Sequence, residues 1–298
     1  MLNQLIIKTM PLVPKGIIHA VAKRYIAGDN LSDAIRVTQE FSKLGGMTTI
    51  DVLGEFVTTK ERALHEKQMS SLVLDAVIKN NMPTYLSIKP TSLGLGIDFD
   101  FAYNNVKELL TKASDAGIFM RIDMENVPYT TKTFDLYKRL KADGFENVGI
   151  VVQAYLFRSE QDIKDLAHYK PNARLCKGIY KESPDVSFQT KTDVRNNYKK
   201  LFNLMMDSGY YVGIATHDDV LIDFAYEQLA KRGMKPEDYE FQMLLGVREE
   251  KRNSILRDGH RMRIYVPFGK DWYGYASRRL KENPDMAGQI FKAIFFKG

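Results

Sequence analysis

Eight short β-rich segments recur along this chain, and a helical stretch separates each of them from the next. Their starts lie about 20–40 residues apart, which leaves room for one crossover helix between parallel strands each time. The segments cover residues 48–53, 84–88, 119–124, 148–155, 173–179, 210–215, 240–245 and 262–266. Several are apolar on both faces, as in the Gly-Ile-Val-Val run at 149–152, which is typical of strands covered by helices. Eight βα units predict an α/β fold with a closed (β/α)8 TIM-type barrel.

An open, doubly wound sheet is the alternative architecture. Such a sheet usually carries a glycine-rich turn after its first strand, and the Asp-Val-Leu-Gly-Glu run at 51–55 has only one glycine. The helical stretches have their own end signals. We expect helices over 101–116, 131–142 and 159–168, the last opening with Ser-Glu-Gln-Asp, which suits the positive end of a helix dipole.

The first 46 residues also carry helical signals. Ser32 is a plausible N-cap before an apolar-periodic run, which Gly45 and Gly46 end. We therefore predict an N-terminal helical segment over 1–46 and a barrel over 47–298. Length alone does not decide the number of domains, because α/β barrels of about 250 residues occur as one domain. No low-complexity linker divides this chain, so we expect one domain overall.

Composition excludes several classes of protein. Lys and Arg number 43 against 37 Asp and Glu, and the net charge of +6 is scattered, whereas nucleic-acid binding needs a clustered basic face. Cys176 is the only cysteine, so neither an intramolecular disulfide nor a thiolate metal cluster can form. No stretch approaches the ~20 apolar residues of a membrane span, and the short apolar start lacks a signal-peptide cleavage site. We expect a cytoplasmic protein, at most peripherally associated with the inner face of the membrane.

Polar side chains gather where the predicted strands end. Barrel enzymes build their active sites at these carboxyl ends. The residues are Glu55, Lys89, Asp123, Glu125, Gln153, Lys177, Thr216, His217 and Tyr265, with Arg174 inside the fifth strand. The set balances cations, anions and neutral hydrogen-bonding groups, and so predicts an active site. His217, Asp218 and Asp219 could hold a metal, but no second His or Cys lies near them in sequence, so we expect none.

A second cluster follows the last strand, in a predicted helix that Pro284 closes. Tyr275, Arg278, Arg279 and Glu282 fall at i, i+3, i+4 and i+7 and therefore share one face. This face is either a solvated surface with an Arg–Glu pair or a clamp for a carboxylate, since adjacent guanidinium groups donate several charge-assisted hydrogen bonds. The sequence leaves both interpretations open.

An ordered set of motifs resembles proline dehydrogenase. The set runs from the second strand to the final helix, most of the chain, in the family's order, and the N-terminal 45 residues carry no matching motif. The motifs are Ser-Ile-Lys-Pro at 87–90, Arg-Ile-Asp-Met-Glu at 121–125, Val-Gln-Ala-Tyr-Leu at 152–156, Arg-Leu-Cys-Lys-Gly-Ile-Tyr at 174–180, Ala-Thr-His-Asp at 215–218, Phe-Gln-Met-Leu-Leu-Gly at 241–246, Arg-Ile-Tyr-Val-Pro-Phe-Gly at 263–269 and Tyr-Ala-Ser-Arg-Arg-Leu-Lys-Glu-Asn at 275–283.

The resemblance implies a distorted barrel with FAD across its carboxyl-terminal mouth. It implies oxidation of L-proline to (S)-1-pyrroline-5-carboxylate, the first step of proline degradation to glutamate, with electrons passed to a membrane quinone. Larger family members also carry an aldehyde dehydrogenase that consumes the product. This chain has no room for one, so we expect a monofunctional protein with a separate pyrroline-5-carboxylate dehydrogenase as its pathway partner.

The resemblance also implies roles for individual residues. Asp123 and Arg174 match the family's catalytic pair, with Tyr265 beside them. Residues matching substrate contacts are Lys89, Arg278 and Arg279, which hold and orient the carboxylate, and Tyr275 and Leu245, which pack with Tyr265 against the ring. Residues matching flavin contacts are Met124, Gln153, Lys177, Gly178, Ile179, Thr216 and His217. Arg174 could stabilise negative charge on the reduced flavin. Asp123 could pair with Lys89 and set the local charge, or assist amine deprotonation.

Two other functions remain open at this point. A (β/α)8 lyase or aldolase could use Lys89 or Lys177 as a Schiff-base amine, and a non-catalytic barrel could merely bind proline or a relative. Bound yellow colour and turnover of a dye acceptor would separate these from a flavoenzyme. A quinone acceptor lies in the lipid phase, so we expect weak membrane contact through the aromatic segment at 290–296.

Overall fold

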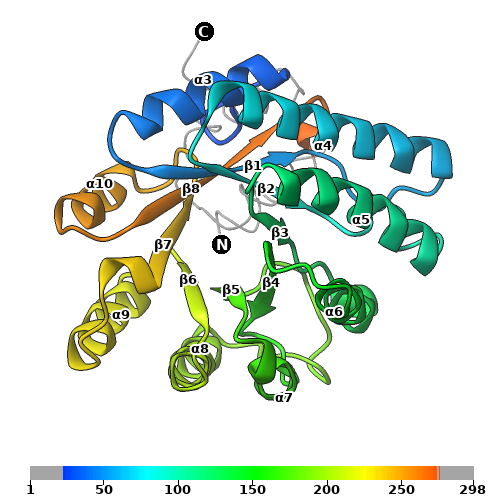
Figure 1. The fold of residues 1–298 in the computed structure, drawn as a ribbon. Helices are drawn as coiled ribbons and strands as arrows, with labels where there is room; N and C mark the ends of the chain where they lie inside the picture. The colour runs from blue at the N-terminus through cyan, green and yellow to red at the C-terminus, as the bar shows by residue number, and fades with distance from the viewer. Residues whose placement is uncertain (1–22, 274, 276–298) are drawn as a thin grey trace, which may run out of the picture.

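Eight parallel strands close into a barrel in the order in which they occur along the chain (Figure 1). The computed structural model describes residues 23–273 and residue 275. The strands are β1 (Met47–Val52), β2 (Thr84–Ile88), β3 (Met120–Ile122), β4 (Val148–Gln153), β5 (Asn172–Cys176), β6 (Tyr211–Ala215), β7 (Tyr239–Leu244) and β8 (Met262–Phe268). Pairing of β1 with β8, which sets Thr49 beside Tyr265, closes the ring. The predicted (β/α)8 barrel is confirmed.

Helices cover the outside of the barrel (Figure 1). Among the described residues, one helix precedes β1 and one follows each of the strands β1 to β7. They are α3 (Leu31–Ser42), α4 (Lys60–Asn80), α5 (Phe99–Asp115), α6 (Val127–Ala142), α7 (Ser159–Leu166), α8 (Lys191–Asp207), α9 (Asp219–Lys231) and α10 (Glu249–Arg257), with single 3-10 turns at η2 (Ala167–Tyr169) and η3 (Pro236–Asp238). None of the helices in the described part of the chain combines the length and apolarity that crossing a bilayer requires.

The start of α3 differs from the prediction. The helix begins at Leu31, and its N-cap is Asn30 rather than Ser32. Asn30 has an extended backbone, and its backbone N–H donates to the Asp33 carboxylate at 3.1 Å. The cap therefore lies two residues earlier than predicted. Helices α5 and α6 also begin earlier, at 99 instead of 101 and at 127 instead of 131.

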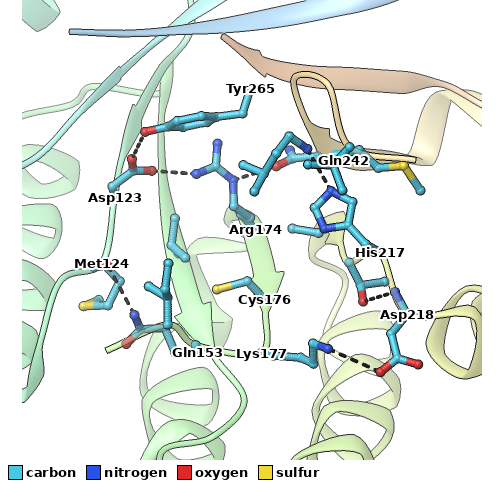
Figure 2. Close-up of a pocket in the computed structure, with 18 of the residues that line it drawn as sticks. Asp123, Met124, Gln153, Arg174, Cys176, Lys177, His217, Asp218, Gln242 and Tyr265 are labelled. Atoms are coloured by element: carbon cyan, nitrogen blue, oxygen red, sulfur yellow. Dashed lines mark hydrogen bonds and ion pairs between the residues drawn. The ribbon is translucent and has the colours of Figure 1, made fainter. Parts of the chain in front are cut away.

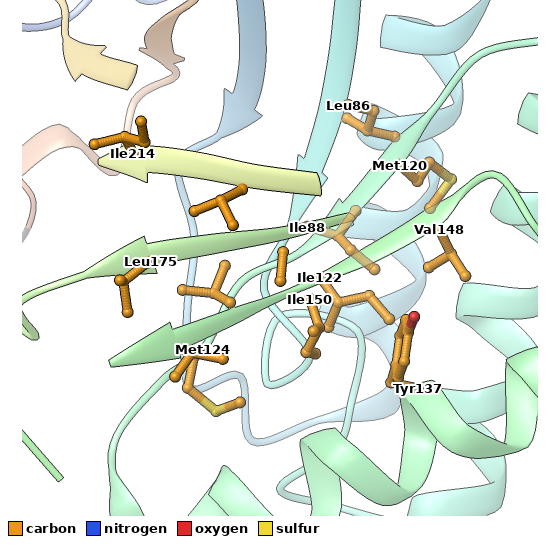
Figure 3. Close-up of a cluster of buried hydrophobic side chains, with 14 of the residues drawn as sticks. Leu86, Ile88, Met120, Ile122, Met124, Tyr137, Val148, Ile150, Leu175 and Ile214 are labelled. Atoms are coloured by element: carbon orange, nitrogen blue, oxygen red, sulfur yellow. The ribbon is translucent and has the colours of Figure 1, made fainter. Parts of the chain in front are cut away.

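The hydrophobic core lies between the strands and the surrounding helices. Every residue of β4 is buried, which explains the continuous apolar run seen in the sequence. Figure 3 shows Ile122, Ile150, Leu175 and Ile214 on neighbouring strands, with Tyr137 of α6 packed against this layer. Burial of one such aliphatic side chain contributes about 1.5–3 kcal/mol, so this layer holds the strand ends in fixed positions.

The interior of the barrel is unusually polar. Arg121 and Arg263 are 1% and 2% exposed, although barrel interiors are commonly filled by branched aliphatic side chains. Arg121 donates to the carbonyl oxygens of Ile150 and Asn172 at 2.9 and 2.6 Å. Arg263 pairs with the buried carboxylate of Glu240. Charged groups therefore lie under the mouth of the barrel, where they can act on the side chains at the strand ends.

Candidate active site

A cavity of about 930 Å³ opens at the carboxyl-terminal ends of the strands. Its size lies at the upper end of the ~300–1,000 Å³ that ligand pockets occupy. Figure 2 shows how side chains from several strands converge on it. The predicted site residues that line it are Lys89, Asp123, Met124, Gln153, Arg174, Lys177, Gly178, Ile179, Thr216, His217, Tyr265 and Tyr275. Most of the predicted site is therefore brought together in one place.

Three residues of the predicted site are not among those lining the cavity. Arg278 and Arg279 lie outside the described residues. Leu245 follows β7 and packs against the hydrophobic core, whereas its neighbour Leu244 lines the cavity. Leu245 was named from the family resemblance alone, and its contact with substrate stays a prediction.

Asp123 and Arg174 form an ion pair at the centre of the cavity (Figure 2). Arg174 Nη1 donates to Asp123 Oδ1 at 2.6 Å. Ser87 Oγ donates to the same oxygen at 2.8 Å, and the Tyr265 hydroxyl donates to Oδ2 at 2.9 Å. The Asp123 carboxylate is thus held by three donors and only 8% of the residue is exposed. This arrangement fixes its position relative to Arg174.

Lys89 pairs with a different carboxylate. Of the two roles considered for Asp123, a direct ion pair with Lys89 is not what the structure has: Lys89 Nζ lies 2.6 Å from Asp51 Oδ2, and both side chains are buried, while the charge of Asp123 also acts on Lys89. Burial raises the pKa of Asp51 to about 6, although Lys89 opposes the change. Burial alone would lower the pKa of Lys89, but the Asp51 carboxylate raises it above its usual value. Lys89 is therefore held as an ammonium.

Glu125 is fully buried beside Thr91. Thr91 donates to it through the backbone N–H at 2.8 Å and through Oγ1 at 2.5 Å. Thr91 Oγ1 also accepts from the backbone N–H of Phe56, whose φ of 54° is rare for a residue with a side chain. Burial raises the pKa of Glu125 to about 7. Glu125 and Thr91 therefore tie the loop after β1 to the ends of β2 and β3.

The opposite side of the cavity is cationic. Its lining includes Lys177, Lys191, Arg195 and Arg248. Asp218 accepts from Arg195 Nε and Nη2 at 2.9 and 2.7 Å and lies 3.3 Å from Lys177 Nζ. Burial would raise the pKa of Asp218, but these cations lower it to about 2. Such a cluster of cations suits phosphate groups.

Two of the three residues considered as a possible metal site, His217 and Asp219, are engaged in other contacts. His217 Nε2 accepts from the Leu244 N–H at 3.0 Å, and Asp219 pairs with Arg248 at 2.9 Å. Within residues 23–273 and 275, no three His, Cys, Asp or Glu side chains come together closely enough to hold a metal ion.

Two features of the cavity wall fit a large cofactor. Gln153 Nε2 donates to the Met124 carbonyl at 3.3 Å, while its buried Oε1 has no partner among the described residues and can accept from a ligand. Gly178 has a φ of 102°, and a Cβ there would collide with the ring of Tyr155. Gly178, which lines the cavity, is therefore packed directly against Tyr155, which leaves no room for a side chain there. Together with the cationic side, the cavity fits a group that has hydrogen-bonding ring atoms at one end and phosphates at the other.

Sequence reasoning missed several residues that line this cavity or contact its lining residues. Asp51 and Glu240 are charged residues inside strands, the same signal that marked Arg174, and could have been found in this way. Gln242 was seen only as part of a motif. Arg195 and Arg248 belong to segments outside the strands, so no local pattern placed them at the mouth.

Comparisons with known proteins bear on this site. The family model described as proline dehydrogenase matches residues 34–292. The chain belongs to the proline dehydrogenase family. Proline dehydrogenase 2 of Bacillus subtilis (strain 168) is 39% identical over 273 residues, which cover 92% of this chain and 90% of that protein. Proline dehydrogenase of Deinococcus radiodurans is 33% identical over 278 residues, with 92% and 90% covered.

A solved structure is similar in fold. It is proline utilization A (PutA) from Bdellovibrio bacteriovorus, inactivated by N-propargylglycine, with a TM-score of 0.82 and 22% identity. The match covers 89% of this chain and 33% of that one, so this proline dehydrogenase family member corresponds to about a third of the larger protein. The family resemblance stated from the sequence motifs is confirmed.

Proposed function

We propose that this chain is an FAD-dependent proline dehydrogenase. It oxidises L-proline to (S)-1-pyrroline-5-carboxylate and passes the electrons to a quinone, as the first step of proline degradation to glutamate. Membership of the proline dehydrogenase family supports the reaction. The observation that carries the proposal is the buried ion pair of Asp123 with Arg174 at the centre of a cavity that fits a dinucleotide.

FAD would lie across the mouth of the barrel. Gln153, whose buried Oε1 has no partner in the described part of the chain, and Met124 would contact the ring system, together with the run from Lys177 to Ile179. Thr216 and His217 would contact the cofactor from β6. The bound flavin would accept the hydride that leaves the carbon beside the proline nitrogen. The protein's task is to bind, orient and charge-balance the substrate next to it.

Cations would position the substrate carboxylate. Lys89, kept as an ammonium by Asp51, would supply one of them from inside the cavity. Arg278 and Arg279, outside the described residues, would supply two planar guanidinium groups. Tyr265 and Tyr275, which line the cavity, would pack against the proline ring. Fixing the carboxylate and the ring converts binding into proximity of the reacting carbon.

Arg174 and Asp123 would act through charge. The Arg174 guanidinium would stabilise negative charge that develops on the reduced ring. Asp123 already accepts from Ser87, Arg174 and Tyr265, so its lone pairs are largely occupied. We therefore assign it to holding Arg174 and balancing its charge rather than to removing a proton from the amine.

The two competing functions are a Schiff-base enzyme and a protein that only binds proline. A Schiff-base enzyme needs a neutral lysine, and the ion pair with Asp51 opposes this state in Lys89. The test is turnover of L-proline by the purified, FAD-loaded protein with a soluble dye as acceptor and detection of the pyrroline product. L-glutamate and D-proline serve as control substrates. Bound flavin with no turnover of any of the three would contradict the proposal and favour a binding protein.

Electron delivery to a quinone requires access to a membrane. We propose peripheral contact through the segment at 290–296, which lies outside the described residues. A separate pyrroline-5-carboxylate dehydrogenase would consume the product, and a cytoplasmic location would suit both proteins.

A further inference from the structure

The guanidinium of Arg174 is held on two sides. On one side Nη1 donates to Asp123 Oδ1 at 2.6 Å, and on the other Nε donates to Gln242 Oε1, also at 2.6 Å (Figure 2). Arg174 and Gln242 are both buried, at 9% and 6% exposure. Charge-assisted hydrogen bonds of this length are strong and directional. The plane of the guanidinium is therefore set by Gln242 as much as by Asp123.

The orientation of the Gln242 amide is determined by a second carboxylate. Gln242 Nε2 donates to Glu240 Oε1 at 2.6 Å. With the amide reversed, its nitrogen would face the Arg174 Nε–H and its oxygen would face the Glu240 carboxylate, so both contacts would become repulsive. Only one orientation satisfies both neighbours. Glu240 thus fixes the oxygen of Gln242 toward Arg174.

Glu240 is itself fixed and kept anionic below the cavity. Arg263 donates to it twice, from Nε to Oε1 at 2.7 Å and from Nη2 to Oε2 at 3.0 Å. The Tyr211 hydroxyl donates to Oε2 at 3.2 Å. Burial would raise the pKa of Glu240, but Arg263 outweighs it and lowers that pKa below its usual value. A carboxylate that stays ionised can only accept hydrogen bonds, so the amide above it cannot reverse.

A glycine on the strand between them leaves room for this chain of contacts. In the sheet register Gly213 of β6 lies beside Arg174 of β5 and beside Glu240 of β7. A Cβ at Gly213 would lie 2.5 Å from Gln242 Nε2 and 3.0 Å from its Cδ. The Gln242 amide therefore occupies the space that a side chain at position 213 would take.

We propose that Gln242 and Glu240 are positioning residues that hold the Arg174 guanidinium in the orientation its role requires, and that Gly213 leaves the space for them. The inference rests on the proposed function, because Arg174 is taken to stabilise the reduced flavin. Neither residue is assigned to the reacting atoms. They act through Arg174, as a support that extends from the mouth into the barrel interior.

Two variants test the support without changing any charge. Gly213→Ala displaces the Gln242 amide, and Gln242→Met removes both of its hydrogen bonds while keeping a similar shape. Ile214→Val is the matched control, because Ile214 lies on the same strand but packs in the hydrophobic layer outside the barrel. The measurements are kcat and KM for L-proline, the midpoint potential of bound FAD, and crystal structures of the variants.

We expect kcat to fall about tenfold in both test variants, since a hydrogen bond to a charged group is lost. The midpoint potential should become more negative by about 30 mV, the two-electron equivalent of tenfold. The KM for L-proline should stay within about twofold, because the carboxylate contacts are untouched, and Ile214→Val should match the wild type in all three quantities. If Gly213→Ala does not fold, Gln242→Met gives the same test.

The outcomes separate the inference from the proposed function. Wild-type potential and kcat in Gln242→Met, or an unmoved Arg174 in the crystal structure of Gly213→Ala, would overturn the inference. The potential and the crystal structures need no turnover, so both can be obtained even from a protein that does not oxidise proline. A wild-type protein that binds FAD, but whose flavin is not reduced by L-proline, would contradict the proposed function and leave the inference standing.

Discussion

Glu125→Gln should make the protein more stable, and the gain should grow with pH. Burial raises the pKa of Glu125 to about 7 from an ordinary value of 4.5. Between these values the folded state binds more protons than the unfolded state. The stabilisation that this proton gives is therefore fully present below about pH 4.5 and is lost as the pH rises through 7. The variant does not lose stability in this way, because glutamine stays neutral at every pH.

The magnitude follows from the two pKa values. At pH 8 the difference between 7 and 4.5, at about 1.36 kcal/mol per pH unit, amounts to about 3 kcal/mol in favour of the variant. At pH 5 the same difference in proton binding favours the variant by about 1 kcal/mol. The amide oxygen of the introduced glutamine can still accept from the Thr91 N–H, but the contact with the Thr91 hydroxyl changes, and this adds a pH-independent offset of about 1 kcal/mol. The change between pH 5 and 8, about 2 kcal/mol, is therefore the quantity to measure.

The assay is urea unfolding of wild type and variant at pH 5, 6, 7 and 8 with equal cofactor loading. Glu237→Gln serves as the control, because it makes the same substitution at an exposed position, away from the buried contact with Thr91. A difference between Glu125→Gln and wild type that is constant from pH 5 to 8 would refute the reasoning, since it would mean that Glu125 titrates alike in the folded and unfolded states.

Three further predictions concern the proposed reaction. Arg174→Met should lower turnover and make the flavin harder to reduce, measured by kcat and midpoint potential; unchanged values would make Arg174 purely structural. Arg278→Met and Arg279→Met should each weaken substrate capture about tenfold to a hundredfold in kcat/KM with normal FAD content, because each removes charge-assisted hydrogen bonds to the carboxylate; an unchanged KM in both would remove the clamp. Deleting residues 288–298 should reduce activity with membrane quinone and spare activity with a soluble dye, whereas equal loss with both would mean that the tail serves folding or the site.

The sequence was sufficient to predict the barrel, because the signals are repeated and local. Each strand, such as β4, is an apolar run with a helical stretch after it, and eight repeats leave few alternative folds. The ends of elements were less certain. Ser32 and Asn30 both have good N-cap chemistry, and only the contact of the Asn30 N–H with Asp33 selects between them.

The site was predicted as a set of residues, but not as a set of partners. Position at a strand end predicted that Asp123 and Lys89 lie in one cavity, and a charge inside a strand added Arg174. Which carboxylate pairs with which cation depends on how far each side chain reaches across the barrel, and the sequence does not encode that locally. Asp51 is 38 residues from its partner Lys89, and Gln242 is 68 residues from its partner Arg174. These contacts form only when the strands assemble into the sheet.

If the proposed function holds, L-proline reduces a flavin bound in this cavity. The direct measurement is the absorbance spectrum of the purified, FAD-loaded protein before and after anaerobic addition of L-proline. The proposal predicts loss of the oxidised flavin band at about 450 nm, since the cofactor carries the redox change. A bound flavin whose band persists at saturating L-proline would contradict it.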